Sequence, residues 1–309
     1  MGTIIESVGV AEARRGLRHP SSVELATRAA RDAIEAAGCE AGEIGLLINA
    51  GVYRDENICE PAIAPFIQRG IGANPALVPG GPTTFSFDVQ NGVCGMLTAI
   101  QVLDGFLSSG VAKRAMVVAS DIDPTPGVSQ GIDFAPSGGA ILLRSVDGPE
   151  GFTAFHSETV GKHSNLFEGH VEWIGEGRSG LSLHLGRNHA ARIRQGENYV
   201  AQCADCAARA IGRFLETRGL TLADVDLVVP SISPAGFPEA LAEGIDAQDC
   251  TMPAPQGGMG IPHSAGPALA LASAMAGERY RKARSVLLVA AGAGITVALA
   301  LYGKRAGAV

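Results

Sequence analysis

One stretch constrains the fold of this chain most, because it places a cysteine between a strand and a helix. Residues 85–89 are bulky and predict a short strand, and apolar side chains then recur at helical spacing from Gly95 to the glycine at position 110. A second apolar strand is predicted over residues 115–119. Cys94 therefore stands at the start of a helix that leads from one buried strand to another.

The position of Cys94 is compatible with two roles. The start of a helix carries partial positive charge and free N–H groups, which would lower the pKa of a thiol and offer hydrogen bonds to an oxyanion. That geometry suits acyl transfer. A free cysteine is also a common apolar residue of protein cores, so position alone leaves catalysis and burial about equally favoured.

Composition sets limits on the partners. The chain has 309 residues, 46% of them hydrophobic and 18% charged, which predicts a closely packed α/β protein. A net charge of −7 argues against nucleic acid or an anionic membrane as a partner. We see neither a membrane-spanning run nor a signal-peptide pattern and expect a cytoplasmic protein. Cys203 and Cys206 form one close pair without a second, so no metal site is expected.

Two pairs of similar segments predict a repeated architecture. Residues 206–233 repeat the order of residues 28–53, which is an amphipathic helix, a short acidic loop and an apolar strand. Cys94 leads a helix and the strand 115–119, and His263 leads a helix and a strand at 286–291. If the halves are structural repeats, a two-fold relation would bring Cys94 and His263 together. The pattern predicts mostly parallel strands, with ligands at their carboxyl ends.

The expected division of the chain falls in the turn-rich region after residue 143. We predict an N-terminal half, residues 1–150, that carries Cys94, and a C-terminal half, residues 151–309, that carries His263. Residues 156–195 show the least regular pattern. They predict a loop-rich insertion over a site.

A family resemblance appears at the cysteine. The segment FDVQNGVCGMLTAIQVL, residues 87–103, resembles the nucleophile segment of the ketoacyl-acyl carrier protein (ACP) synthase III group of the thiolase superfamily. The glycines at 138–139, the LVVPS and IDAQDC segments, and AAGAGITVALAL near the C-terminus resemble later landmarks of that group. The resemblance implies a five-layered αβαβα fold made of two pseudo-repeated halves. It also implies a homodimer in which the strand before the cysteine pairs across the two-fold axis.

The resemblance further implies a substrate and no bound cofactor. The substrate would be acyl-CoA or a phosphopantetheine-linked acyl-ACP, with the carrier protein as a partner. Residues 53–62, YRDENICEPA, are similar to the branch that joins two acyl thioesters head to head, in which the residue matched by Glu60 acts as base. His263, in GIPHSAG, resembles the histidine of elongating synthases. Ser231 stands where the group has a histidine, and the catalytic asparagine of its GNT motif has no counterpart.

These residues define the expected site. Cys94 would carry an acyl group, His263 would move protons, and Ser231 would donate one hydrogen bond. The backbone N–H groups of Cys94 and Ala293 would hold the oxyanion. Glu60 would act as a carbon base if burial raised its pKa, and otherwise it is an acidic residue at a helix N-terminus with a proline in the first turn.

The reaction class stays open at this point. The acceptor of the acyl group would be an oxygen, nitrogen or carbon nucleophile, in fatty-acid-like or polyketide biosynthesis. The alternatives are a decarboxylative or head-to-head condensing ketosynthase, a non-catalytic partner subunit of a ketosynthase, and a thioester hydrolase. The missing histidine and asparagine pair disfavours malonyl decarboxylation, because that pair would hold the enolate oxygen.

Overall fold

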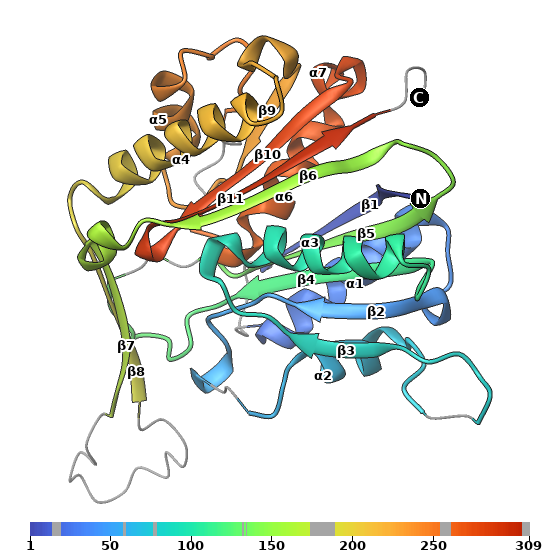
Figure 1. Ribbon diagram of the computed structural model, residues 1–309. Helices are drawn as coiled ribbons and strands as arrows, with labels where there is room; N and C mark the ends of the chain where they lie inside the picture. The colour runs from blue at the N-terminus through green and yellow to red at the C-terminus, as the bar shows by residue number, and fades with distance from the viewer. Residues whose placement is uncertain are drawn as a thin grey trace, which may run out of the picture.

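The computed structural model of the chain describes residues 1–13, 20–57, 60–76, 79–131, 133, 135–173, 189–253 and 261–304. These residues form two principal sheets (Figure 1). The first has the order β1 (Gly2–Glu12), β5 (Ser137–Val146), β4 (Arg114–Asp121), β2 (Ile44–Asn49) and β3 (Phe85–Asp88). The second has the order β6 (Gly151–Thr159), β11 (Thr296–Gly303), β10 (Ser285–Gly292) and β9 (Leu227–Pro230).

Helices lie outside and between the two sheets, so the molecule has five layers in the order αβαβα (Figure 1). The outer helices on the first sheet are α1 (Ser22–Ala37) and α2 (Ala64–Ile71). The helices between the sheets are α3 (Gly95–Ser108) and α6 (Gly266–Ala276), which is followed by α7 (Glu278–Lys282). The outer helices on the second sheet are α4 (Tyr199–Glu216) and α5 (Phe237–Gly244).

Sequence pattern explains which helix occupies which layer. The outer helices α1 and α4 each have one apolar face and one polar face, so only one side packs on a sheet. The central helices α3 and α6 are apolar over most of their circumference, because a sheet covers them on both sides. Three apolar clusters result, one under α1, one around α3 and α6, and one under α4.

The two sheets are built alike. In the first, the strands β1, β5, β4 and β2 lie in the same order as β6, β11, β10 and β9 in the second. The helix α1 matches α4, and α3 matches α6. The predicted thiolase-like fold of two pseudo-repeated halves is confirmed. The division at residue 150 stays a prediction.

Strand direction differs from the sequence expectation. Among the described pairs of the two sheets, only β2–β3, β2–β4 and β9–β10 are parallel, and the other four are antiparallel. The prediction of mostly parallel strands was therefore wrong. The chain returns from β4 to β5 and from β10 to β11 without a crossover helix, and such connections make antiparallel neighbours.

The expected loop-rich insertion at residues 156–195 is also corrected. Its described part contains the end of β6 and an antiparallel hairpin of β7 (Phe167–Trp173) and β8 (His189–Gln195), which projects from the body of the molecule (Figure 1). Residues 174–188 of the predicted insertion lie outside the described part. In the sequence FEGHVEW of β7, apolar or small residues alternate with charged and histidine side chains. This period of two marks a strand that has one polar face.

None of the described helices combines the length and the apolar character that crossing a membrane requires.

Candidate active site

Two helix starts meet between the sheets. Cys94 is the last residue of the 3₁₀ turn Gly92–Cys94 and directly precedes α3. His263 is the first residue of the 3₁₀ turn His263–Ala265, which precedes α6. The two turns contact each other. The repeated architecture therefore brings the two segments together, as the sequence repeat predicted.

The repeat is offset by two residues from the predicted equivalence. Cys94 immediately precedes α3 and Ala265 immediately precedes α6, so these two positions correspond. His263 corresponds to Gly92 instead. Both residues have a left-handed backbone, with φ of 52° at Gly92 and 42° at His263. Glycine adopts this conformation easily, whereas histidine adopts it at a cost of about 1–3 kcal/mol, and such strain is concentrated at functional sites.

The Cys94 thiol is sealed from water. Its Sγ atom lies 3.3 Å from the carbonyl oxygen of Thr296 and 3.6 Å from that of Ala290, and the residue is 0% exposed. Burial and, to a smaller extent, the neighbouring thiol of Cys203 raise the pKa of Cys94 to about 12. The sequence expectation of a lowered pKa was wrong. The helix start was visible in the sequence, but the dry surroundings and the two carbonyl oxygens were not.

The two predicted oxyanion donors, the backbone N–H groups of Cys94 and Ala293, have different surroundings. The backbone N–H of Cys94 donates to the carbonyl oxygen of Asn91 over 3.0 Å, so this donor already has a partner. Ala293 opens the turn after β10, and its side chain is exposed. The preceding Gly292 lies against Val93, the neighbour of Cys94, since a Cβ atom at Gly292 would stand 3.3 Å from the Cβ of Val93. The oxyanion roles stay predictions.

His263 is paired with a buried carboxylate. Its Nδ1 atom lies 3.3 Å from Oδ2 of Asp121, and the Tyr53 ring packs edge-on against the imidazole with centroids 4.8 Å apart. Asp121 ends strand β4 and is 0% exposed. Burial alone would raise the pKa of Asp121, but the hydrogen bonds from His263 and Ser264 and the positive charge that His263 can carry hold this pKa below its usual value.

Sequence reasoning missed Asp121 and Tyr53. A signal for Asp121 was present, because it is a charged residue at the carboxyl end of an apolar strand, where ligands gather. Tyr53 had no comparable signal. Its proximity to His263 depends on contacts between residues that are far apart in the chain.

Ser231 lies close to the start of α6. It is 1% exposed, and its Oγ atom accepts a hydrogen bond from the backbone N–H of Ser233 over 3.2 Å. A Cβ atom at Gly266 would stand only 2.6 Å from that oxygen, so Ser231 faces the helix start rather than open space. The hydrogen bond that its oxygen accepts thus comes from Ser233, and its role as a hydrogen-bond donor in the reaction stays a prediction.

Glu60 stands apart from the buried site. Its side chain is exposed in the single chain, so the burial on which its predicted role as a carbon base depends is absent there. The alternative role at a helix N-terminus is corrected as well, because α2 begins at Ala64. The carboxylate that accepts from the backbone N–H groups at this start, those of Ile63 and Ala64, belongs to Asp88.

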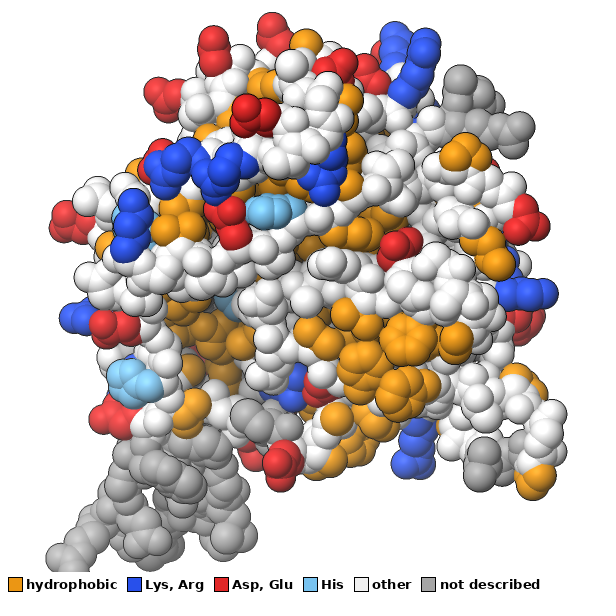
Figure 2. Space-filling model, viewed as in Figure 1, with side chains coloured by type: hydrophobic (Ala, Val, Ile, Leu, Met, Phe, Trp, Pro, Cys, Tyr) orange, Lys and Arg blue, Asp and Glu red, His pale blue; other side chains and the backbone are white. Residues whose placement is uncertain are grey.

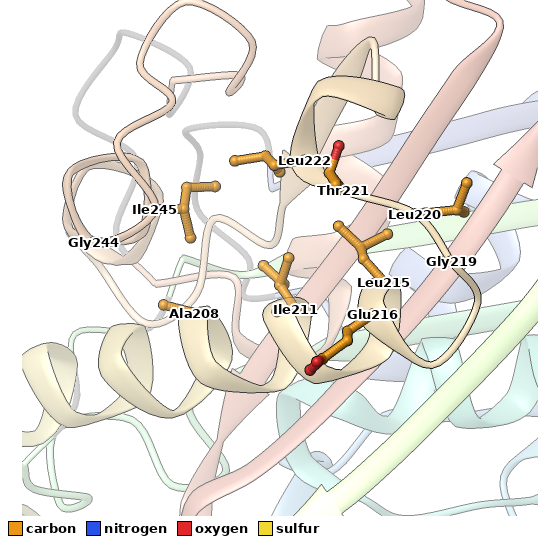
Figure 3. Close-up of a pocket in the computed structure, with 11 residues that line it drawn as sticks. Ala208, Ile211, Leu215, Glu216, Gly219, Leu220, Thr221, Leu222, Gly244 and Ile245 are labelled. Carbon is orange, nitrogen blue, oxygen red and sulfur yellow. The ribbon is translucent and has the colours of Figure 1, made fainter.

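A separate pocket lies in the outer layer, between α4, the loop that follows it and the end of α5 (Figure 3). Its walls are mostly apolar, with Ile211, Leu215, Leu222 and Ile245 among them. None of the predicted catalytic residues lines it. The paired thiols of Cys203 and Cys206 are buried in α4, and the described residues contain no cluster of three side chains that could hold a metal ion.

Comparison with known proteins gives consistent results. The family described as 3-oxoacyl-[acyl-carrier-protein (ACP)] synthase III matches residues 87–161. Beta-ketoacyl-[acyl-carrier-protein] synthase III of Thiobacillus denitrificans is 27% identical over 303 residues, which cover 96% of this chain and 89% of the relative.

Solved structures resemble the whole chain. The 3-oxoacyl-[acyl-carrier-protein] synthase III of Aquifex aeolicus has a TM-score of 0.78 at 19% identity, covering 98% of this chain and 100% of that one. OleA of Xanthomonas campestris, solved with lauric acid and lauroyl-CoA, has a TM-score of 0.77 at 15% identity, covering 98% and 99%. At these identities the likeness establishes the fold.

Proposed function

We propose that this chain, a ketoacyl-ACP synthase III-like enzyme of the thiolase superfamily, passes an acyl group from an acyl thioester through an acyl-Cys94 intermediate to a nucleophile. The observation that carries the proposal is the meeting of two helix starts, which places Cys94 beside the turn that carries His263, whose imidazole is paired with Asp121 of β4. A nucleophile, a base and a group that orients the base are the parts that acyl transfer requires.

Loading would begin with removal of the thiol proton. At neutral pH a thiol with a pKa of about 12 is almost entirely protonated, so general-base help is needed. Nε2 of His263 would accept that proton while the sulfur attacks the thioester carbonyl. The tetrahedral intermediate would then expel CoA or carrier thiolate, which takes the proton from His263. One thioester bond forms at Cys94, and one breaks in the donor.

Transfer would reverse these roles. The same nitrogen of His263 would take a proton from an incoming hydroxyl or amine, whose oxygen or nitrogen attacks the acyl group on Cys94. The Cys94 thiolate would leave and be reprotonated by the imidazolium. Ser231 can donate one hydrogen bond but cannot act as a useful base near neutral pH. This single-base arrangement supports transacylation over malonyl decarboxylation.

A homodimer is part of the proposal. Strand β3 lies at the edge of the first sheet, and Phe85 on this strand is 61% exposed and contacts Phe87. Figure 2 shows hydrophobic side chains gathered over the region of β3 and α3. An unpaired strand edge beside exposed aromatic rings suits pairing with a second copy. Solution scattering at micromolar concentration should give the mass of a dimer, and a monomer would contradict it.

Intact-protein mass spectrometry tests the central claim. The enzyme is incubated with acyl-CoA and acyl-ACP thioesters of graded chain length, and each productive donor should add the mass of its acyl group. Cys94→Ala should show no adduct, and Cys206→Ala, which removes a buried thiol far along the chain, should acylate like the wild type. An adduct on Cys94→Ala would refute the proposal.

Glu60→Gln separates carbon–carbon bond formation from simple transfer. Glu60 is exposed in the single chain, so it would be the base for a carbon nucleophile only where the second copy of the dimer covers it, whereas hydroxyl or amine acceptors rely on His263. The variant should lose condensation of two acyl thioesters and keep acylation of Cys94. Glu56→Gln, which changes a nearby exposed acid, is the matched control. Condensation that survives in Glu60→Gln would remove this residue from the mechanism.

A further inference from the structure

We propose that Asp121 is a positioning residue that fixes the proton of His263 on Nδ1 and thereby leaves Nε2 as the base that serves Cys94. The inference rests on the proposed function, because it describes how the base of that reaction is held. The acyl-loading steps above use only Cys94 and His263, and the inference gives Asp121 a separate role in them.

Three residues other than His263 hold the carboxylate in place. Oδ1 of Asp121 accepts from the backbone N–H groups of Val52, at 2.9 Å, and of Tyr53, at 2.6 Å. Oδ2 accepts from the backbone N–H of Ser264, at 2.6 Å, and from the Ser264 hydroxyl. Four donors that do not belong to His263 therefore fix both oxygens, so the orientation of the carboxylate does not depend on the imidazole.

This arrangement determines the tautomer of His263. An ionised carboxylate accepts hydrogen bonds and cannot donate them, so Nδ1 at 3.3 Å from Oδ2 must carry a proton. The lowered pKa of Asp121 keeps the carboxylate ionised at neutral pH. In the neutral imidazole, Nε2 then has a free lone pair.

The backbone supports the same conclusion. Asp121 binds the N–H of Ser264 and the side chain of His263, so it holds two successive residues of one turn. The left-handed φ of 42° at His263 is unfavourable for a residue with a Cβ atom and persists because these contacts hold it. The strain therefore serves to aim the imidazole, which the edge of Tyr53 also confines.

The need for such help follows from the nucleophile. Burial raises the pKa of Cys94 to about 12, and proton transfer from this thiol to an isolated imidazole is therefore unfavourable. The negative charge of Asp121 stabilises the imidazolium that forms when His263 accepts the proton. The carboxylate and the buried thiol are thus complementary parts of one site.

Asp121→Asn tests this role. The asparagine Oδ1 can keep the bonds from Val52 and Tyr53. Its Nδ2 cannot accept from the Ser264 N–H and would donate towards His263, which reverses the tautomer. We expect acylation of Cys94 to slow by roughly 10²–10⁴-fold, and by no more than the loss of His263 itself, because the imidazole is then held in the wrong tautomer. Ser264→Ala removes one donor and keeps the carboxylate, so it should change the rate by less than about 10-fold.

Two readouts distinguish positioning from a purely structural role. The ¹⁵N chemical shifts of His263 in histidine-labelled protein should show the proton on Nδ1 in the wild type and on Nε2 in Asp121→Asn. In a His263→Ala background, Asp121→Asn should add almost no further loss, because both changes disable one unit.

The proposal is overturned if the wild-type His263 carries its proton on Nε2, or if Asp121→Asn costs as much in the His263→Ala background as in the wild type. The first result needs only the wild-type protein, so it decides the question even if the variant fails to fold. It is also independent of acylation. A wild type that shows Nδ1–H but never acylates Cys94 would refute the proposed function and leave the tautomer assignment standing.

Discussion

The start of α3 and the start of α6 occupy matching places in the two halves, but the two sites have opposite electrostatic surroundings. Cys94 faces two carbonyl oxygens in a dry environment that raises its pKa, and carbonyl oxygens do not stabilise a thiolate. His263 faces the buried carboxylate of Asp121, which stabilises a positive charge on the ring. The repeated backbone therefore supplies the location, and the residues that other elements bring to it determine the chemistry.

The largest effect is expected from a change at the start of α6, where it tests the proposed role of the His263 ring. His263→Ala should lower the single-turnover rate of Cys94 acylation by roughly 10²–10⁴-fold, the usual contribution of a positioned acid–base. Ser231→Ala is the matched control, because the hydroxyl of Ser231 bonds to Ser233 and not to the imidazole or the thiol, and it should change the rate by less than about 10-fold. If Ser231→Ala cost as much as His263→Ala, the assignment of the base would be wrong.

An effect of intermediate size is expected in the alkylation rate of Cys94 at the start of α3. Because the pKa of Cys94 is raised to about 12, its thiolate fraction should grow about 10-fold per pH unit, and iodoacetamide should react with it correspondingly faster up to about pH 11. At neutral pH the partly exposed Cys39 and Cys250 should be alkylated before Cys94 in the protein without substrate. Peptide mapping after timed alkylation measures all three. Fast alkylation of Cys94 with a plateau below pH 8 would show a lowered pKa instead.

The smallest effect tests the backbone equivalence of Gly92 and His263. Gly92→Ala should destabilise the fold by about 1 kcal/mol, because an added Cβ meets no neighbour but the residue must keep a φ of 52°. Gly105→Ala, at an exposed position within α3 where an added Cβ also meets no neighbour, should stabilise by roughly 0.5–1 kcal/mol. Urea unfolding measures both. A Gly92→Ala protein as stable as the wild type would show that the left-handed turn is not required.

Local periodicity was sufficient to predict the frame of the site. The helix at 95–108 follows from apolar residues at helical spacing, and the strand at 114–121 follows from a continuous apolar run, as does the strand at 285–292 in the second half. The similarity between the segment after Cys94 and the segment after His263 predicted that the two helix starts would meet. These features depend on residues that are near one another in the chain, so the sequence expresses them directly.

The environment of each side chain was decided by the tertiary structure. Asp121 is 142 positions from His263, and the carbonyl oxygen of Thr296 is 202 positions from Cys94. The exposure of Glu60 and the hydrogen bond of Ser231 likewise depend on distant elements. A pKa is set by solvent access and by charges within a few ångströms. The sequence thus determined where the proposed nucleophile and the proposed base would stand, and only the packing of the two halves decided which charges and how much water would surround them.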